Sequence, residues 1–89
     1  MEVVYTEHFW DRFYRRKKES PLPLTLELVE LAIFSPDFVL PDKNHPNREC
    51  RIKKVKGRCL KVVVEPCGKK LVVITLMFDR NLRRKGLCE

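Results

Sequence analysis

The fold is decided by residues 48–78, RECRIKKVKGRCLKVVVEPCGKKLVVITLMF. Three β-prone runs in this stretch span 48–56, 59–65 and 70–78. The turns between them, at Gly57 and at 66–68, are so short that they demand antiparallel hairpins. The last run is apolar on both faces, which predicts a central strand that is covered on both sides.

The register of the first hairpin determines which face of the sheet its charges occupy. If Val55 pairs with Cys59, one face of the hairpin is apolar. That face carries Cys50, Ile52, Leu60, Val62 and Val64. The other face carries Arg51, Lys53 and Lys61, with Val63 among them. A one-residue slip would change these pairings. In the favoured register, one face of the sheet is core and the other is a cationic platform.

A helix is expected ahead of the sheet, between Thr6 and Ser20. The side-chain oxygen of Thr6 can cap its first turn, and Pro21 forbids its continuation. Four aromatic residues at helical spacing form one stripe: Phe9, Trp10, Phe13 and Tyr14. This stripe can be read as a base-stacking platform, but its spacing on an amphipathic helix favours a place in the core.

A second helix is expected over residues 26–34, capped by Thr25 and ended by Pro36. It is apolar nearly all round, so we expect it to be well buried. Residues 38–40 can add a short strand. The sequence therefore predicts a single α+β domain over residues 1–89, with two N-terminal helices packed on a three- or four-stranded antiparallel sheet. Residues 79–89 are expected to form a basic C-terminal tail.

Positive charge is concentrated in the first hairpin. The chain has 19 Lys and Arg against 12 Asp and Glu, a net charge of +7. Residues 48–61 contain seven of the basic residues and only one acidic residue, Glu49. Such a run is either an ordinary solvated surface or a binding site for phosphates or an acidic partner.

The four cysteines, Cys50, Cys59, Cys67 and Cys88, contain no C-x-x-C pair, so we expect no zinc site and no other metal. The N-terminus has no hydrophobic signal core, which predicts a cytoplasmic protein with reduced thiols. Cys50 and Cys59 are expected to be small core residues. No stretch approaches the roughly 18 apolar residues of a membrane span.

The order of these features resembles the RelE superfamily of toxin–antitoxin ribonucleases, and more closely the small uncharacterised family placed beside the BrnT toxins. The resemblance covers nearly the whole chain, and its specificity comes from the order and spacing of loose motifs. These are Thr6-x-His8-x-x-x-Arg12, Ser35-Pro36-Asp37, Arg48-Glu49 at the start of a strand, and the hairpin 52–64 followed by 71–75.

The resemblance implies an endoribonuclease that needs neither a metal nor another cofactor. A ribose 2′-oxygen would attack the neighbouring phosphate, while cations stabilise the developing charge. The catalytic candidates are His8, Arg12 and Arg51. The candidates for RNA binding are Arg48, Lys53, Lys61, Arg80, Arg83 and Arg84. The implied partners are RNA, either free or on the ribosome, and an acidic antitoxin protein, and the apolar third strand leaves room for a homodimer.

Several alternatives remain open on the sequence alone. His8 can be an exposed residue of a helix start, and His45 an ordinary turn residue in a proline-containing loop. Arg12 can form ion pairs along its helix. At the level of function, a nucleic-acid-binding module without catalysis, or an interaction protein that docks an acidic partner, needs only the basic surface.

Overall fold

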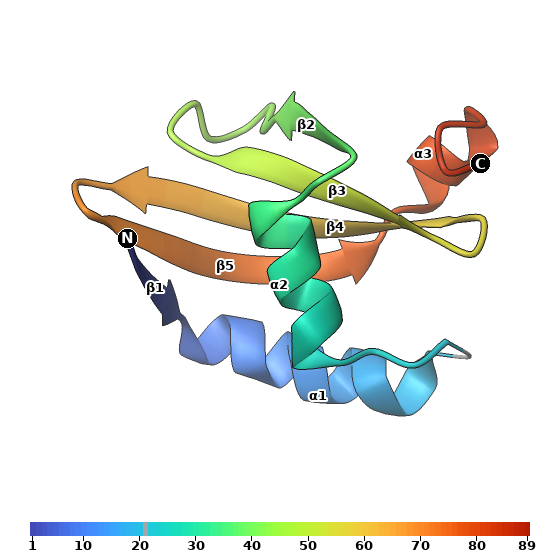
Figure 1. The fold of residues 1–89 in the computed structure, drawn as a ribbon, viewed down its shortest axis with the longest axis horizontal. Coiled ribbons are helices and arrows are strands. Elements are labelled where there is room, and N and C mark those ends of the chain that lie inside the picture. Colours follow the sequence, from blue (N-terminus) through green and yellow to red (C-terminus); the bar gives the residue numbers. More distant parts are fainter. Residues whose placement is uncertain (21) are drawn as a thin grey trace.

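The strands form one five-stranded mixed sheet, with the order β1-β5-β4-β3-β2. The computed structural model describes residues 1–20 and 22–89 (Figure 1). Its strands are β1 (Glu2–Tyr5), β2 (Phe38–Pro41), β3 (Glu49–Val55), β4 (Arg58–Cys67) and β5 (Lys70–Phe78). The predicted hairpins β3–β4 and β4–β5 are present and antiparallel, as is the β2–β3 pair. β1 pairs in parallel with β5, which corrects the expectation of three or four antiparallel strands.

Of the three helices within residues 1–20 and 22–89, two pack on one face of this sheet. They are α1 (Glu7–Glu19) and α2 (Leu26–Phe34). Phe9 and Phe13 of α1 and Val29 of α2 share one hydrophobic core with side chains of β4 and β5. That face, which carries Leu60, Val62 and Val64, is called the helix face below. The class of fold is therefore α+β, as predicted, with more strands and one more helix than expected.

Thr6 fixes the start of α1 to the sheet. Its Oγ1 accepts a hydrogen bond from the Phe9 amide at 3.0 Å, as predicted for a cap. The same hydroxyl donates to the Ile74 carbonyl of β5 at 3.0 Å. The helix ends before Ser20. Of the aromatic stripe, Phe9 and Phe13 are fully buried, whereas Tyr14 is 57% exposed at its margin.

The second helix is less buried than the sequence predicts. Thr25 caps it through the Leu28 amide at 3.2 Å, as expected. Only Val29, Ala32 and Ile33 are buried, however, and Phe34 remains 58% exposed. The prediction of a well-buried helix is wrong because α2 packs on the sheet with one side only.

The turn of the β3–β4 hairpin is one residue shorter than expected. Val55 pairs with Arg58, so the turn consists of Lys56 and Gly57 alone. Both residues have positive φ, 47° and 79°, as the common two-residue hairpin turn requires. Side chains alternate between faces, so this one-residue difference moves every charge of β3 to the other face relative to β4.

The expected cationic platform is therefore split between the two faces of the sheet. Arg51 pairs with Val62 and Lys53 with Leu60, which places both cations on the helix face. Lys61 pairs with Ile52 on the opposite face. The prediction that Arg51, Lys53 and Lys61 share one face is wrong.

β5 is an internal strand, as predicted, but it is covered on one side. Leu71, Val73 and Leu76 are buried. Val72, Ile74 and Met77 are only half-buried. The central position in the sheet belongs to β4.

Residues 79–89 are folded against β4 and are not a free tail. They contain α3 (Arg80–Arg84), whose Leu82 is buried in a second cluster with Cys50 and Ile52. A disulfide joins Cys59 of β4 to Cys88, which corrects the prediction of reduced thiols at these two positions. Cys50 and Cys67 are free thiols. Burial raises the pKa of Cys50. No helix in the described part of the chain is long and apolar enough to cross a membrane.

The dual role of Thr6 gives a test of how α1 is attached. We expect Thr6→Ala to lower the free energy of unfolding by about 1–2 kcal/mol, because it removes both the cap and the bond to β5. Thr6→Ser keeps both bonds and should remain within about 0.5 kcal/mol of the wild type. Urea unfolding followed by circular dichroism measures both values. An equal loss in the two variants would contradict this role.

Candidate functional site

Two of the predicted phosphate-binding cations hold the end of α2. The Arg51 guanidinium donates from Nη1 to the Ile33 carbonyl at 2.6 Å and from Nη2 to Glu49 at 2.9 Å. The Lys53 ammonium donates to the Ser35 carbonyl at 3.0 Å. The last carbonyls of a helix lack intrahelical partners, and basic side chains commonly satisfy them. Both cations therefore attach α2 to the sheet.

Two further residues of the predicted RNA-binding surface are engaged with carboxylates. Arg48 lies 3.3 Å from Glu65, and Lys61 lies 3.1 Å from Asp79. A phosphate would have to compete with these carboxylates for the same donors.

The predicted catalytic residues are not brought together. His8 is exposed and Arg12 half-exposed, both in the first half of α1, while Arg51 faces the end of α2. Within residues 1–20 and 22–89, no hydrogen bond or ion pair joins any of the three to another. His45 is exposed in the β2–β3 loop, 3.8 Å from Asp42. The hydrogen bond from the Asn44 amide holds the pKa of Asp42 below its usual range, and it outweighs desolvation, which acts in the opposite direction.

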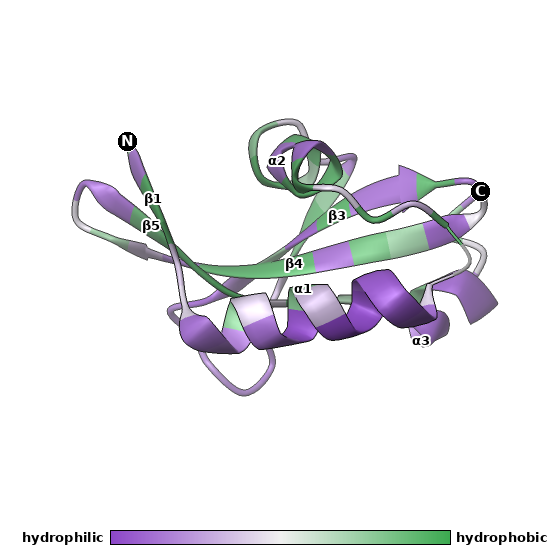
Figure 2. Cartoon of the chain, turned by 90° about the horizontal axis from the view of Figure 1, so that it is seen from below, coloured by the Kyte–Doolittle hydropathy of each residue, from purple (hydrophilic) through white to green (hydrophobic). Residues whose placement is uncertain are grey.

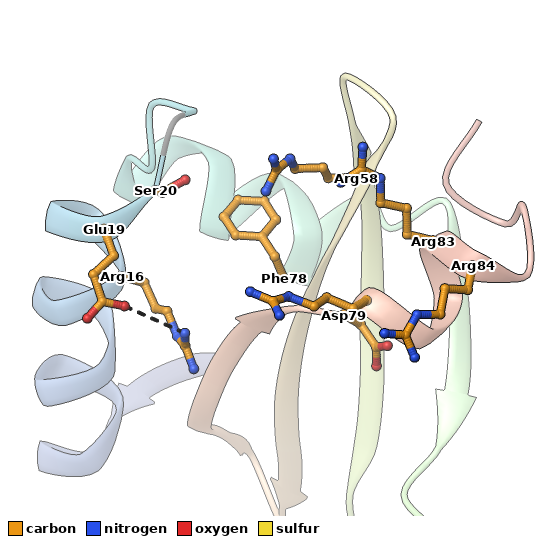
Figure 3. A pocket seen from close by; sticks show the side chains of 9 residues that line it. Arg16, Glu19, Ser20, Arg58, Phe78, Asp79, Arg83 and Arg84 are labelled. Atoms are coloured by element: carbon orange, nitrogen blue, oxygen red, sulfur yellow. Dashed lines mark ion pairs between the residues drawn. The ribbon is translucent and has the colours of Figure 1, made fainter.

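Five arginines instead converge on a pocket of about 530 Å³ at one end of the molecule. The pocket lies between the end of α1, the start of β4, the end of β5, and α3 (Figure 3). Its arginines are Arg16, Arg58, Arg80, Arg83 and Arg84. The remaining lining residues are Glu19, Ser20, Phe78 and Asp79. We call this site the arginine pocket.

Opposing walls of the arginine pocket present guanidinium groups. Figure 3 shows Arg16 on α1 at one side, Arg83 and Arg84 on α3 at the other, and Phe78 between them. Arg16 Nη1 lies 3.8 Å from Glu19. The Nε of Arg16 is buried and has no hydrogen-bond partner among the described residues. A buried N–H without an acceptor is costly, so an acceptor placed in the pocket beside it would relieve this cost.

Asp79 holds α3 at the edge of the pocket and pairs with Lys61, so it does not neutralise the pocket arginines. Its Oδ1 accepts hydrogen bonds from the Asn81 amide at 2.9 Å and the Leu82 amide at 3.1 Å, and so caps α3. Its Oδ2 pairs with Lys61. Burial raises the pKa of this carboxyl, but the Leu82 amide, Lys61 and the Asn81 amide together outweigh that effect and lower it.

The remaining pocket arginines keep their donors available. Within residues 1–20 and 22–89, no carboxylate lies within 4.0 Å of Arg58, Arg80, Arg83 or Arg84. Each guanidinium offers a planar fork of N–H donors that matches phosphate oxygens. Figure 2 shows the same end of the molecule as hydrophilic, with purple residues along the second half of α1 and on α3. This end therefore carries a group of uncompensated positive charges and favours an anion.

The sequence identified part of this site. Arg80, Arg83 and Arg84 were candidates for RNA binding, and they line the pocket together. Arg16, Arg58 and Phe78 were missed. The charged end of the first predicted helix was the available signal for Arg16, but its proximity to α3 depends on tertiary packing.

Comparison of the chain with protein-family models, with curated proteins and with solved structures gives no match. The resemblance to the RelE superfamily and the BrnT toxins thus stays a prediction. In the described part of the chain, no three His, Cys, Asp or Glu side chains gather closely enough to hold a metal ion.

Asp79 gives the stability of the protein a pH dependence of known sign. Because its folded-state pKa is lowered, its contribution is fully present above the unfolded-state value of about 3.9 and is lost as the pH falls through the folded-state value. We expect Asp79→Asn to lower the free energy of unfolding by about 1 kcal/mol at neutral pH. The difference from the wild type should shrink as the pH falls below about 4.

Urea unfolding across this pH range measures the effect. Asp11→Asn, an exposed change on α1, is the matched control and should alter stability by no more than about 0.5 kcal/mol throughout. A deficit in Asp79→Asn that stays constant at all pH values would contradict the ionic role of Asp79.

Proposed function

We propose that this protein binds single-stranded RNA without cleaving it, and that the arginine pocket contacts the phosphates. The observation that supports this proposal most strongly is the convergence of four arginines without carboxylate partners in one concave site. Like charges held close together repel one another, and a bound polyanion would relieve that repulsion.

The aromatic residue in the pocket supports a single-stranded ligand. Phe78 is half-exposed and lies between the arginine-bearing walls (Figure 3). Every base has a π-face, so a base that is free of its stack can pack on an aromatic ring beside a cationic groove. Sequence-specific RNA recognition uses such splayed bases, whereas double helices are recognised by their shape.

Binding is supported better than cleavage. Neither histidine lines the pocket: His8 lies near the start of α1, and His45 lies in the β2–β3 loop. Asp79, the pocket carboxylate nearest to α3, is occupied by two amides and Lys61. The other pocket carboxylate, Glu19, lies 3.8 Å from Arg16, so both carboxylates beside the arginines are already engaged with cations and neither is set apart as a base for the 2′-hydroxyl. Toxin-type cleavage and an acidic protein partner stay predictions of the resemblance.

Substitution of the α3 arginines tests the binding site. We expect Arg83→Gln combined with Arg84→Gln to weaken binding of a mixed-sequence single-stranded RNA at least about tenfold, because two charge-assisted contacts are lost. Fluorescence anisotropy at a fixed salt concentration measures the dissociation constant. Lys43→Gln in the exposed β2–β3 loop together with Lys69→Gln in the exposed β4–β5 turn removes the same charge far from the pocket and is the matched control.

An equal loss in the two double variants would indicate nonspecific attraction and would overturn the assignment of the pocket. A DNA strand of the same sequence provides the comparison between the two nucleic acids. Tight binding of an acidic peptide with no binding of RNA would favour the protein partner instead.

Cleavage is tested separately. We expect the labelled RNA to remain intact after incubation with the protein in EDTA, because the described pocket offers phosphate contacts without a histidine. Denaturing gel electrophoresis detects any product. Products that are lost in His8→Ala would show that the toxin-type reaction takes place and that its site lies elsewhere on α1.

A further inference from the structure

The arginine pocket contains more positive charge than one phosphate inside a strand requires. A phosphodiester carries one negative charge and two non-bridging oxygens. The pocket has five arginines against two carboxylates, and one of these carboxylates, Asp79, is paired with Lys61. A terminal phosphate ester carries about −1.5 to −2 at neutral pH and three acceptor oxygens. The charge of the pocket thus matches a terminal phosphate better than an internal one.

The shape of the pocket also favours an end over a continuous strand. Its volume of about 530 Å³ lies within the roughly 300–1,000 Å³ of sites that enclose one small molecule. α1 and α3 stand on opposite sides of it (Figure 3). A strand that continued along the sheet would meet Arg48, Arg51, Lys53 and Lys61, and these cations are held by carboxylates or by the end of α2.

An aromatic ring and guanidinium groups give the pocket distinct places for the two parts of a nucleotide. Phe78 supplies an aromatic surface for a base, and the guanidinium groups of Arg16 and Arg83 approach from opposite walls (Figure 3). The buried Arg16 Nε has no acceptor in the described protein. A shift of the Arg16 side chain toward the pocket would bring this N–H to a phosphate oxygen, whereas the Asp79 carboxylate already has its hydrogen bonds.

We propose that the arginine pocket recognises a terminal phosphate attached to a nucleoside, with the base on Phe78 and the phosphate between the arginines of α1 and α3. This inference rests on the proposed RNA binding and specifies which part of the RNA is bound. The same chemistry is present in a phosphorylated strand end and in a free nucleotide.

Oligoribonucleotides of one sequence that differ only in their ends test the proposal. Four ligands are compared by anisotropy at fixed salt: one with hydroxyls at both ends, one with a 5′-monophosphate, one with a 5′-triphosphate and one with a 3′-phosphate. We expect at least one phosphorylated end to bind about tenfold or more tightly than the hydroxyl form, because extra charge-assisted hydrogen bonds form there. Competition with a nucleoside monophosphate then shows whether a free nucleotide occupies the same site.

Variants connect that preference to the pocket. Arg83→Gln should reduce the preference for a phosphorylated end, and Arg83→Lys should restore it only partly, because lysine keeps the charge without the fork. Phe78→Leu should raise the dissociation constants of all four ligands by the same factor, since it removes base stacking and leaves the arginines in place. Lys43→Gln should leave the preference unchanged, and circular dichroism checks that each variant is folded.

The experiment distinguishes failure of the end-recognition proposal from failure of the proposed RNA binding. Equal binding of all four oligoribonucleotides would overturn the recognition of an end and would leave the proposed RNA binding intact. Binding of none of them would overturn both proposals. A preference for a phosphorylated end that persists undiminished in Arg83→Gln, together with unchanged affinities in Phe78→Leu, would place the recognition outside the arginine pocket and would also overturn the inference.

Discussion

The two-residue turn of the β3–β4 hairpin is the constraint on which the rest of the structure depends. With Lys56 and Gly57 alone in the turn, the register of the hairpin is fixed, and with it the face of every side chain. Arg51 then reaches the carbonyl end of α2, and Lys61 reaches Asp79 at the start of α3. The register that separates the basic residues of the hairpin thus uses them to attach a helix to each face of the sheet.

The attachment of α3 explains why its arginines can form a site at all. A helix of five residues is not stable by itself. The segment is held by the Asp79 cap, by the buried Leu82 and by the disulfide from Cys59 to Cys88. A ligand that met these arginines in a free tail would first have to order the tail, whereas here much of that ordering is complete before binding.

Local signals in the sequence predicted most elements, and non-local pairings account for the errors. The caps at Thr6 and Thr25 and the three strands of 48–78 follow from neighbouring residues, and all are present. β1 has only four residues, and its parallel partner is far along the chain. Lysine is rarely found at positive φ, so the residue types at Lys56-Gly57 give no clear signal of the two-residue turn. Cysteine spacing does not determine connectivity, and the five arginines of the pocket meet only after folding.

The net charge of +7 is a poor guide to the place where an anion would bind, because it does not distinguish compensated from uncompensated cations. Arg48, Arg51 and Lys61 lie in the most basic stretch of the chain, yet each has a carboxylate partner. A ligand there would have to replace an existing bond and would gain little. Arg83 and Arg84 come from a less conspicuous part of the sequence and keep their donors free. What selects a binding surface in this protein is therefore the absence of carboxylates around a group of cations, more than the density of cations along the chain.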